Sequence, residues 1–246
     1  MIMANKRYDT FYTKYGKRLI DLFLSLIIIL CFFWLYLIIA LIVRIKLGSP
    51  VIFAQIRPGI IDRNTGKEKL FKLYKFRSMT NETDEDGALK PDDIRLTSFG
   101  KKLRSSSLDE IPEIINIIKG DMSFVGPRPQ LVKDMVFMSK EVRQRHSITP
   151  GLTGLAQVNG RNNMTWDEKF EYDIEYINNV TFLNDIKIII KTILKIVGIE
   201  KTEEGEVNIA EDYGDYLLNL KRITKEEYDL KILEEKKMLV EANGKL

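Results

Sequence analysis

The stretch that decides the architecture is Arg104–Gln130, RSSSLDEIPEIINIIKGDMSFVGPRPQ. It contains two adjacent carboxylates, Asp109 and Glu110, and ends with an arginine, Arg128, between two prolines. Isoleucines recur at i, i+3, i+4 and i+7 after the carboxylates, which predicts a helix that begins close to Leu108 and ends at a glycine. The carboxylates are therefore expected at the N-terminal end of a helix, where N–H groups and the helix dipole favour negative charge.

Two interpretations of this helix start are open from the local sequence. In the first, the carboxylates hold a divalent cation near a phosphate-bearing ligand, and one of them is a nucleophile. In the second, they belong to an ordinary capping box, with Ser107 as the cap and Glu110 three residues later. Pro112 fits both, because proline lacks an N–H and is accepted in the first turn of a helix. The local pattern alone favours the capping box, since acidic helix starts are common.

Composition narrows the class of protein. The 246 residues are 45% hydrophobic and 30% charged, which is typical of a globular chain. A single cysteine and a single histidine exclude an internal disulfide and a metal centre built from either residue type. Residues 201–246 carry 8 basic and 12 acidic residues, so the first 200 residues carry a net charge of +7. A basic body suits an anionic membrane surface or phosphate ligands, and no dense Lys/Arg stripe with aromatics predicts nucleic-acid binding.

A run of 22 residues without a charge, Leu22–Val43, follows a basic N-terminus. At about 1.5 Å per residue this run can cross a hydrocarbon core of about 30 Å, and it is too long for the apolar part of a signal peptide. Basic residues flank both of its ends, among them Arg18 and Arg44. The flanks therefore leave two topologies open, a spanning helix and a re-entrant helix that returns to the cytoplasmic side.

The remaining segments predict a mixed fold with more helix than strand. Residues 51–59 and 69–79 are rich in β-branched and aromatic residues on either side of an Asn-Thr-Gly turn, which predicts a β-hairpin. The acidic residues 80–93 predict a surface loop, with a metal site as the alternative. Helices are expected at residues 94–104, 130–144 and 166–197, a turn-rich loop at 150–154, and a short strand and turn in 156–162.

Lysines four residues apart accompany the apolar runs near the end of the last of these helices, at Lys187, Lys191 and Lys195. This spacing predicts an amphipathic helix that lies on a bilayer surface, and a core helix with its lysines in water is the alternative. Residues 201–246 predict an acidic helical tail with a capping box at residues 224–227.

Six motifs, taken together and in order, resemble one enzyme family. They are Lys17-Arg18-Leu-Ile-Asp21, Phe53-Ala-Gln-Ile-Arg57-Pro58-Gly59, Tyr74-Lys75-Phe76-Arg77-Ser-Met79, Ser107-Leu-Asp109-Glu110, Lys119-Gly120-Asp121-Met122-Ser123-Phe124-Val125-Gly126-Pro127-Arg128-Pro129 and Pro150-Gly151-Leu-Thr153-Gly154-Leu-Ala-Gln157-Val-Asn159-Gly160-Arg161. Residues 15–197 are similar to the small monotopic phosphoglycosyl transferases of the bacterial sugar transferase family, which start glycan assembly on a polyprenyl phosphate. With this resemblance, the capping box becomes the weaker interpretation of the two carboxylates.

The resemblance implies a phosphoglycosyl transfer in two steps. Asp109 would displace UMP from a UDP-sugar, and polyprenyl (undecaprenyl) phosphate would then take the phospho-sugar from the aspartate. Mg²⁺ held by Asp109 and Glu110 is the implied cofactor, with Glu110 as metal partner or as base. The implied phosphate-binding residues are Arg104, Arg128 and Lys75.

The resemblance also implies an α+β, mostly helical fold with a re-entrant membrane helix, a small β-hairpin and amphipathic interfacial helices. The expected divisions are a basic N-terminus and membrane helix at 1–48, a cytoplasmic catalytic domain at 49–200 and the acidic tail at 201–246. The enzyme would lie on the bacterial inner membrane, in contact with membrane lipid and with both chain ends in the cytoplasm. The family usually breaks its membrane helix with a Ser-Pro pair, whereas this chain has Phe32-Phe33-Trp34-Leu35 there and no proline between Leu22 and Val43.

Two other functions stay open at this point. One is a non-enzymatic membrane scaffold in a glycan assembly complex, and the other is a membrane-tethered nucleotide hydrolase that releases UMP without an acceptor lipid. The sequence leaves open the destination of the glycan and a homodimer. It also leaves open the sugar, with a plain hexose, an N-acetylhexosamine and a di-N-acetylated bacillosamine-type sugar as the alternatives. His146 matches a family position, and a structural role is the favoured interpretation.

Overall fold

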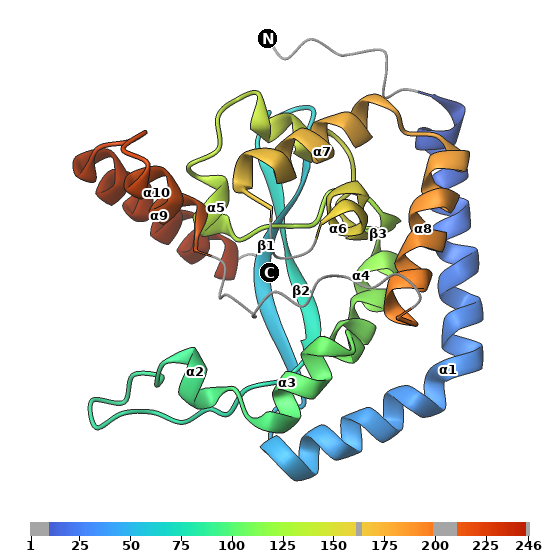
Figure 1. Ribbon diagram of the computed structural model, residues 1–246, viewed down its shortest axis with the longest axis horizontal. Coiled ribbons are helices and arrows are strands. Elements are labelled where there is room, and N and C mark those ends of the chain that lie inside the picture. Colours follow the sequence, from blue (N-terminus) through green and yellow to red (C-terminus); the bar gives the residue numbers. More distant parts are fainter. Residues whose placement is uncertain (1–9, 161–163, 199–210, 245–246) are drawn as a thin grey trace. The chain divides into compact units, whose positions relative to one another are not determined.

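The computed structural model describes residues 10–160, 164–198 and 211–244 (Figure 1). The elements are η2 (Tyr12–Gly16), α1 (Lys17–Leu47), β1 (Ile52–Ile61), β2 (Glu68–Phe76), α2 (Asp92–Arg95), α3 (Ser98–Ser105), η3 (Leu108–Glu113), α4 (Ile114–Lys119), β3 (Ser123–Val125), α5 (Val132–Met135), η4 (Val142–Ser147), β4 (Gly151–Thr153), α6 (Leu155–Asn159), α7 (Trp166–Asn178), α8 (Phe182–Ile196), α9 (Tyr213–Asn219) and α10 (Lys225–Asn243). β1 and β2 form an antiparallel pair, and β3 and β4 form a parallel pair. An α+β, mostly helical fold is therefore confirmed. The expectations for residues 1–9, for Arg161 and for residues 201–210 concern positions outside the described ranges.

The chain forms two compact units. Unit 1 consists of residues 1–21, 56–72 and 120–246, and unit 2 consists of residues 22–55 and 73–119. The chain thus leaves unit 1 within α1 and returns to it twice, so α1, β1 and β2 each contribute residues to both units. These units divide the chain at positions other than the domain boundaries expected after residues 48 and 200.

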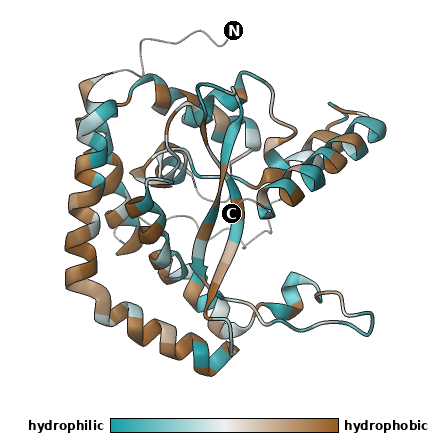
Figure 2. Ribbon diagram, turned by 180° about the vertical axis from the view of Figure 1, so that it is seen from behind, coloured by the Kyte–Doolittle hydropathy of each residue, from teal (hydrophilic) through white to brown (hydrophobic). Residues whose placement is uncertain are grey.

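Helix α1 is apolar and bends about halfway along its length (Figure 1 and Figure 2). Together with the π-helical turn η2 it forms a 36-residue segment that is long and apolar enough to cross a membrane, as the uncharged run predicts. Near its midpoint, the indole N–H of Trp34 donates to the carbonyl oxygen of Cys31 at 2.8 Å. A side chain that enters the backbone hydrogen-bond ladder is one established cause of a helix bend. The helix therefore bends without the proline that the family usually has.

Unit 2 is built on the C-terminal half of α1. Its apolar cluster consists of Ile39 and Val43 from α1, Phe76 from β2 and Leu103 from α3. Leu108 and Ile111 of η3 pack against this cluster. Leu108 and Ile111 are partly buried there, so these two contacts hold η3 against the cluster.

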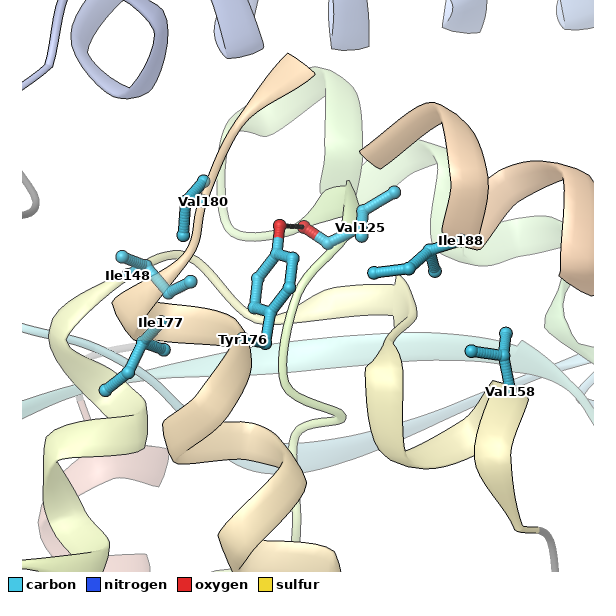
Figure 3. Close-up of a cluster of buried hydrophobic side chains, with 7 residues drawn as sticks. All are labelled: Val125, Ile148, Val158, Tyr176, Ile177, Val180 and Ile188. Carbon is cyan, nitrogen blue, oxygen red and sulfur yellow. Dashed lines mark hydrogen bonds between the residues drawn. The ribbon is translucent and has the colours of Figure 1, made fainter. Parts of the chain in front are cut away.

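Unit 1 contains two apolar clusters. The first consists of Val125, Ile148, Val158, Tyr176, Ile177, Val180 and Ile188 (Figure 3). Within it, the Tyr176 hydroxyl donates to the Val125 carbonyl oxygen at 3.3 Å, which joins α7 to β3. The second cluster brings Trp166 and Phe170 of α7 together with Tyr213 and Leu217 of α9. Part of the acidic tail therefore contributes to the core of unit 1.

Helix α8 leaves an apolar face outside this core. Its inner face carries Asp185 and Ile188, both buried. Its exposed apolar side chains are Phe182, Leu183, Ile190, Ile193, Ile196 and Val197. Lys187 and Lys191 are exposed as well and border that face at helical spacing. An exposed apolar face bordered by lysines is the pattern of an amphipathic helix, and its contact with a bilayer surface stays a prediction.

The β-hairpin is confirmed, whereas several other local predictions are wrong. Residues 130–144 form only the short helix α5 and the start of η4. The expected strand near 156–159 is the helix α6, and the expected loop before it contains the strand β4. The helices expected at 94–104 and 166–197 are each interrupted, at Thr97 and Thr181, whose side chains cap the helix that follows. Burial decides the secondary structure of such segments: in α6, for example, Val158 lies in the core. Local propensity contains no information about burial of this kind.

Candidate functional site

Turn η3 places the two carboxylates directly after a residue in an uncommon backbone conformation. Ser107 has a left-handed backbone with a φ of 57°, which costs energy for any residue except glycine. A 3₁₀ turn that contains Pro112 follows, and the helix ends at Gly120, whose φ is +86°. The expected start near Leu108 and the glycine stop are therefore confirmed. The capping box is wrong, because the Ser107 side chain makes no cap hydrogen bond.

The two carboxylates differ in exposure and in environment. Asp109 is buried, with 7% of its surface exposed. Glu110 is half-buried and accepts a hydrogen bond from Lys75 Nζ at 2.7 Å. The same ammonium group lies 3.3 Å from Oε1 of Glu113, one turn further along. One lysine thus bridges two carboxylates of η3. Glu113, which was not predicted from the sequence, is therefore added to the candidate site residues.

Lys75 is kept beside η3 by its two neighbours in β2. The backbone N–H of Tyr74 donates to the buried Asn116 side chain at 3.0 Å. Phe76, on the other side, enters the apolar cluster of unit 2. Because the backbone is held on both sides of Lys75, its ammonium group can contact the carboxylates with little further loss of conformational entropy.

Arg104, also predicted as a site residue, lies in the last turn of α3. Its Nε donates to Ser78 Oγ at 2.9 Å, and the side chain is otherwise exposed. Earlier on the same helix, Gly100 approaches the Ser78 carbonyl oxygen so closely that a Cβ would lie 1.8 Å from it. This close approach is available only to glycine and fixes α3 against the end of the Tyr74–Met79 motif.

Arg77 is a functional candidate that sequence reasoning missed. Its guanidinium donates to the carbonyl oxygens of Leu47, at the end of α1, and of Ser49, at 2.8 Å for the latter. The last carbonyls of a helix lack partners within the helix, so Arg77 satisfies groups that would otherwise need water. The signal available in the sequence was its place in the same short motif as Lys75. The motif therefore joins the apolar helix to the lysine of the site.

Arg128 belongs to unit 1, where two parallel strands present its segment. Beyond the paired strands β3 and β4, Gly126 N–H donates to the Thr153 carbonyl at 2.9 Å, and Gly151 N–H donates to the Pro127 carbonyl at 3.0 Å. A Cβ on Gly151 would lie 2.0 Å from the Gly126 nitrogen. The glycines thus let two backbones touch, and this contact brings together two motifs that are far apart in the sequence.

His146 has a structural place in unit 1, as expected. Its ring is 3% exposed, with Nδ1 at 3.1 Å from Glu68 Oε1 and Nε2 at 3.4 Å from Arg145 Nη1. Burial lowers the pKa of His146 to about 4, so the ring is neutral at pH 7. A neutral ring with these partners donates from Nδ1 to Glu68 and accepts at Nε2 from Arg145. Although burial opposes ionisation of Glu68, hydrogen bonds from His146 and Arg143 lower its pKa to about 2.

The Lys17–Asp21 motif has partners that the sequence did not reveal. The Asp21 carboxylate accepts from Ser123 Oγ at 3.1 Å and from the Phe124 N–H at 3.0 Å. Lys17 Nζ donates to the buried carboxylate of Asp185 on α8. The first turns of α1 are therefore joined both to α8 and to the strand that leads to Arg128.

A metal site has a limited donor set here. Within the described ranges, no group of three or more His, Cys, Asp or Glu side chains could hold a metal ion, and the acidic loop at 80–93 gives no support to a metal site there. Mg²⁺, however, commonly uses one or two protein carboxylates together with water and substrate phosphates. The adjacent carboxylates Asp109 and Glu110 fit such a site.

Comparison with known proteins places the chain in one family. The model of the bacterial sugar transferase family matches residues 12–198. An uncharacterized sugar transferase, EpsL of Bacillus subtilis, is 43% identical over 189 residues, which cover 76% of this chain and 91% of that protein.

Two relatives with named activities are similar over part of their length. The UDP-glucose:undecaprenyl-phosphate glucose-1-phosphate transferase of Klebsiella pneumoniae is 39% identical over 189 residues, which are 73% of this chain and 39% of that protein. The UDP-N-acetylgalactosamine-undecaprenyl-phosphate N-acetylgalactosaminephosphotransferase of Aeromonas hydrophila is 35% identical over 189 residues, which are 74% of this chain and 43% of that protein. The chain thus spans about two fifths of these two relatives. The family match and the agreement of the motifs show that the chain belongs to the bacterial sugar transferase family.

Proposed function

We propose that this protein transfers a phospho-sugar from a UDP-sugar to undecaprenyl phosphate and releases UMP. The observation that carries the proposal is that the turn with Asp109 and Glu110 packs, through Leu108 and Ile111, against the apolar cluster to which Ile39 and Val43 of α1 belong. A lipid phosphate is confined to the bilayer surface, so a nucleophile that shares an apolar cluster with a membrane helix lies where such an acceptor can reach it. The named relatives are undecaprenyl-phosphate sugar phosphotransferases, which supports the same acceptor here.

The reaction would proceed in two steps. In the first, a carboxylate oxygen of Asp109 attacks the sugar-linked phosphorus of the UDP-sugar, the bond to the bridging oxygen breaks, and UMP leaves with that oxygen. In the second, a phosphate oxygen of undecaprenyl phosphate attacks the same phosphorus, which frees Asp109 and gives the undecaprenyl-diphospho-sugar. Splitting the transfer in this way is covalent catalysis, and it predicts ping-pong kinetics.

The neighbouring charges have separate tasks in this proposal. Lys75 offsets the negative charge of Glu110 and Glu113, so that an anionic substrate is not repelled from η3. Arg104 and Arg128 would hold phosphate oxygens through their planar, multi-donor guanidinium groups. Mg²⁺ held by Asp109 and Glu110 would supply charge neutralisation for the diphosphate.

We further propose that α1 enters the bilayer and returns to the cytoplasmic side. The bend halfway along α1 and the Trp34–Cys31 hydrogen bond support a helix that turns within the membrane. The exposed apolar face of α8 with its lysines supports contact with the lipid surface. In this topology the catalytic residues face the cytoplasm of a bacterial inner membrane.

The decisive experiment is an assay of UMP release by the purified full chain in detergent micelles. The donors are UDP-glucose, UDP-galactose, UDP-N-acetylgalactosamine and UDP-di-N-acetylbacillosamine, each with and without undecaprenyl phosphate and with Mg²⁺ or EDTA. The transferase requires Mg²⁺-dependent UMP release and a lipid-linked phospho-sugar with one donor. Release that continues over many turnovers without the lipid would favour the tethered hydrolase, and no release with any donor would favour the scaffold.

A further inference from the structure

The backbone of the Pro127-Arg128-Pro129 segment is held by two arginines, Arg57 of the Phe53–Gly59 motif and Arg145, which lies outside the six motifs. Arg145 Nη2 donates to the Arg128 carbonyl oxygen at 2.7 Å. Arg57 Nη1 donates to the Pro129 carbonyl oxygen at 3.2 Å. Proline has no N–H, so a Pro-Arg-Pro segment has few backbone donors, and its carbonyl oxygens are its main means of attachment. The conformation of this segment therefore depends on side chains that donate to those carbonyls.

Arg145 is the more constrained of the two donors. It is 1% exposed, and both Nε and Nη2 donate to Asp173 Oδ2, at 2.8 and 2.6 Å. Its guanidinium also lies over the ring of Phe170, with its central carbon 5.6 Å from the ring centroid. A planar guanidinium with fixed partners can present its remaining donors in only one orientation.

The partners of Arg145 are themselves anchored. Asp173 is 3% exposed on α7, where Phe170 and Tyr176 enter the two apolar clusters of unit 1. On the other side, the neutral His146 accepts from Arg145 Nη1 and is fixed by the buried Glu68. Taking a charge of this kind out of water has a desolvation cost even when the charge is paired. Because the Arg145–Asp173 pair is buried in unit 1 despite this desolvation cost, we look for a role of Arg145 other than packing.

We propose that Arg145, oriented by Asp173, is a positioning residue that sets the conformation of the Arg128 backbone and thereby the placement of the Arg128 side chain. This inference rests on the proposed function, because it takes Arg128 to bind substrate phosphate. Arg145 acts through the peptide carbonyl and not on the substrate. A displacement of about 1 Å in a substrate-holding group is enough to reduce a rate by about 100-fold. The hydrogen bond from Arg145 to the Arg128 carbonyl oxygen would prevent such a displacement.

The test uses the full chain in detergent and compares Arg145→Lys with Arg143→Gln. Lysine keeps the positive charge, but a single ammonium group cannot present the fork that binds Asp173 and the Arg128 carbonyl together. Arg143→Gln is the matched control, since Arg143 belongs to the same network through Glu68 but has no contact with the Arg128 carbonyl. If Arg145→Lys does not fold, Asp173→Asn replaces it, because this variant keeps the guanidinium and weakens only its orientation.

The first readout is a double-mutant cycle on kcat/KM for UMP release, with Arg128→Ala as the second change. We expect about a 10-fold loss for Arg145→Lys and about a 100-fold loss for Arg128→Ala, with less than a twofold further loss when both are combined. Losses that multiply, or full activity of Arg128→Ala, would overturn the inference. Arg143→Gln should stay within twofold of the wild-type value.

The second readout does not depend on activity, so it separates failure of this inference from failure of the proposed function. Hydrogen exchange of the Gly151 amide reports on the segment, because this amide donates to the Pro127 carbonyl. We expect faster exchange there in Arg145→Lys and unchanged exchange in Arg143→Gln. Unchanged exchange in Arg145→Lys would overturn the positioning role, whereas absence of UMP release by the wild-type protein would overturn the proposed function alone.

Discussion

The Lys75–Glu110 ion pair at η3 in unit 2 and the Arg145–Asp173 ion pair in unit 1 differ in their exposure to solvent. Around η3, the side chains of Lys75 and Glu110 keep 19% and 18% of their surface exposed. In unit 1, the side chains of Arg145 and Asp173 keep only 1% and 4%. Lys75 and Glu110 can therefore exchange water for a ligand, whereas the buried Arg145–Asp173 pair can only hold its partners. Within η3 the exposure differs from residue to residue, since Asp109 is only 7% exposed.

The difference separates groups that act on a substrate from groups that hold the protein in shape. Both units contain clustered carboxylates and cations, so residue type alone does not distinguish the two roles. The distinction comes from the surroundings: η3 stands at the edge of an apolar cluster on α1, and the Arg145 network lies between two apolar clusters of unit 1. Substitutions around η3 should therefore affect turnover directly, whereas substitutions in the Arg145 network should affect stability, and turnover only through Arg128.

The largest effect is expected for Asp109→Asn. Asparagine has nearly the same shape but cannot serve as the nucleophile, so UMP release should fall by at least about 10³-fold. The unfolding midpoint should move by no more than about 3 °C, because the change lies at the edge of a core. Asp93→Asn, at an exposed position of the same unit, is the control and should keep full turnover. Near-wild-type turnover of Asp109→Asn would contradict the assignment of the nucleophile.

A smaller effect on turnover is expected for Lys75→Met. Without the ammonium group, Glu110 and Glu113 would face the diphosphate uncompensated, and kcat/KM should fall by about 10- to 100-fold. Lys101→Met removes an exposed lysine of the same unit and should change kcat/KM by less than twofold. Equal effects of the two variants would show that only net charge matters and would remove Lys75 from the site.

In unit 1, the buried ionisable groups His146 and Glu68 should make the free energy of unfolding depend on pH. The pKa of His146 falls from about 6.5 to about 4 on burial, so the unfolded chain binds more protons between these values. Stability is therefore lost as the pH falls from 6.5 toward 4, by about 3 kcal/mol at most. Glu68, whose folded pKa is about 2, adds a further loss as the pH falls below about 4.5.

The measurement is the free energy of unfolding in detergent at a series of pH values, for the wild type and for His146→Gln. The part of the slope between pH 6.5 and 5 that comes from His146, the single histidine, should be absent in the variant. Asp21, Asp134 and Asp173, whose pKa values are raised by burial, contribute to the slope of both proteins. A slope that remains unchanged in His146→Gln would show that the ring is not buried in its neutral form.

The smallest effect is expected from the apolar face of α8. Ile193→Asp places a charge on that face and should reduce binding to anionic lipid vesicles by about two- to fivefold, because α1 still anchors the chain. Leu233→Asp makes the same change at an exposed apolar residue of α10 and should leave vesicle binding unaltered. Equal losses for the two variants would mean that α8 has no special contact with lipid.

The orientation of α1 can be tested in intact bacterial cells that produce the protein. A single cysteine at position 5, in a Cys31→Ser background, should stay unlabelled by a membrane-impermeant maleimide added outside the cell, as should a second one at position 244. A spanning helix would instead expose the N-terminal cysteine to the outside. That result would replace the re-entrant topology by a transmembrane one.

Much of the site was predictable because its residues lie close together in the sequence. The spacing of the isoleucines and the final glycine located the helix after Asp109 and Glu110. Lys75 was found through its motif, and its contact with Glu110 joins positions 35 residues apart. Glu113 could have been found as well, because it lies three residues after Glu110 on the same turn.

The Arg145 network was not predictable from local patterns. Residues 130–144 have a helical pattern, but the structure forms only α5 and η4 there, and Arg145 meets Asp173 across 28 residues. Similarly, residues 155–159 form a helix because Val158 is buried, although Ala-Gln-Val-Asn favours no single state. In each case the deciding interaction is with a distant segment, which propensity cannot represent.

The sequence by itself determined the apolar helix, the hairpin and the position of the paired carboxylates at a helix start, because each depends on neighbours within a few residues. Only the tertiary structure decided which charged pairs are partly exposed to solvent and which are held inside the fold. Burial is a property of the packed chain: Glu110 and Asp173 carry the same carboxylate, but one stands at an edge and the other lies in a core. The free energy of desolvation, which follows from that placement, assigns them different roles.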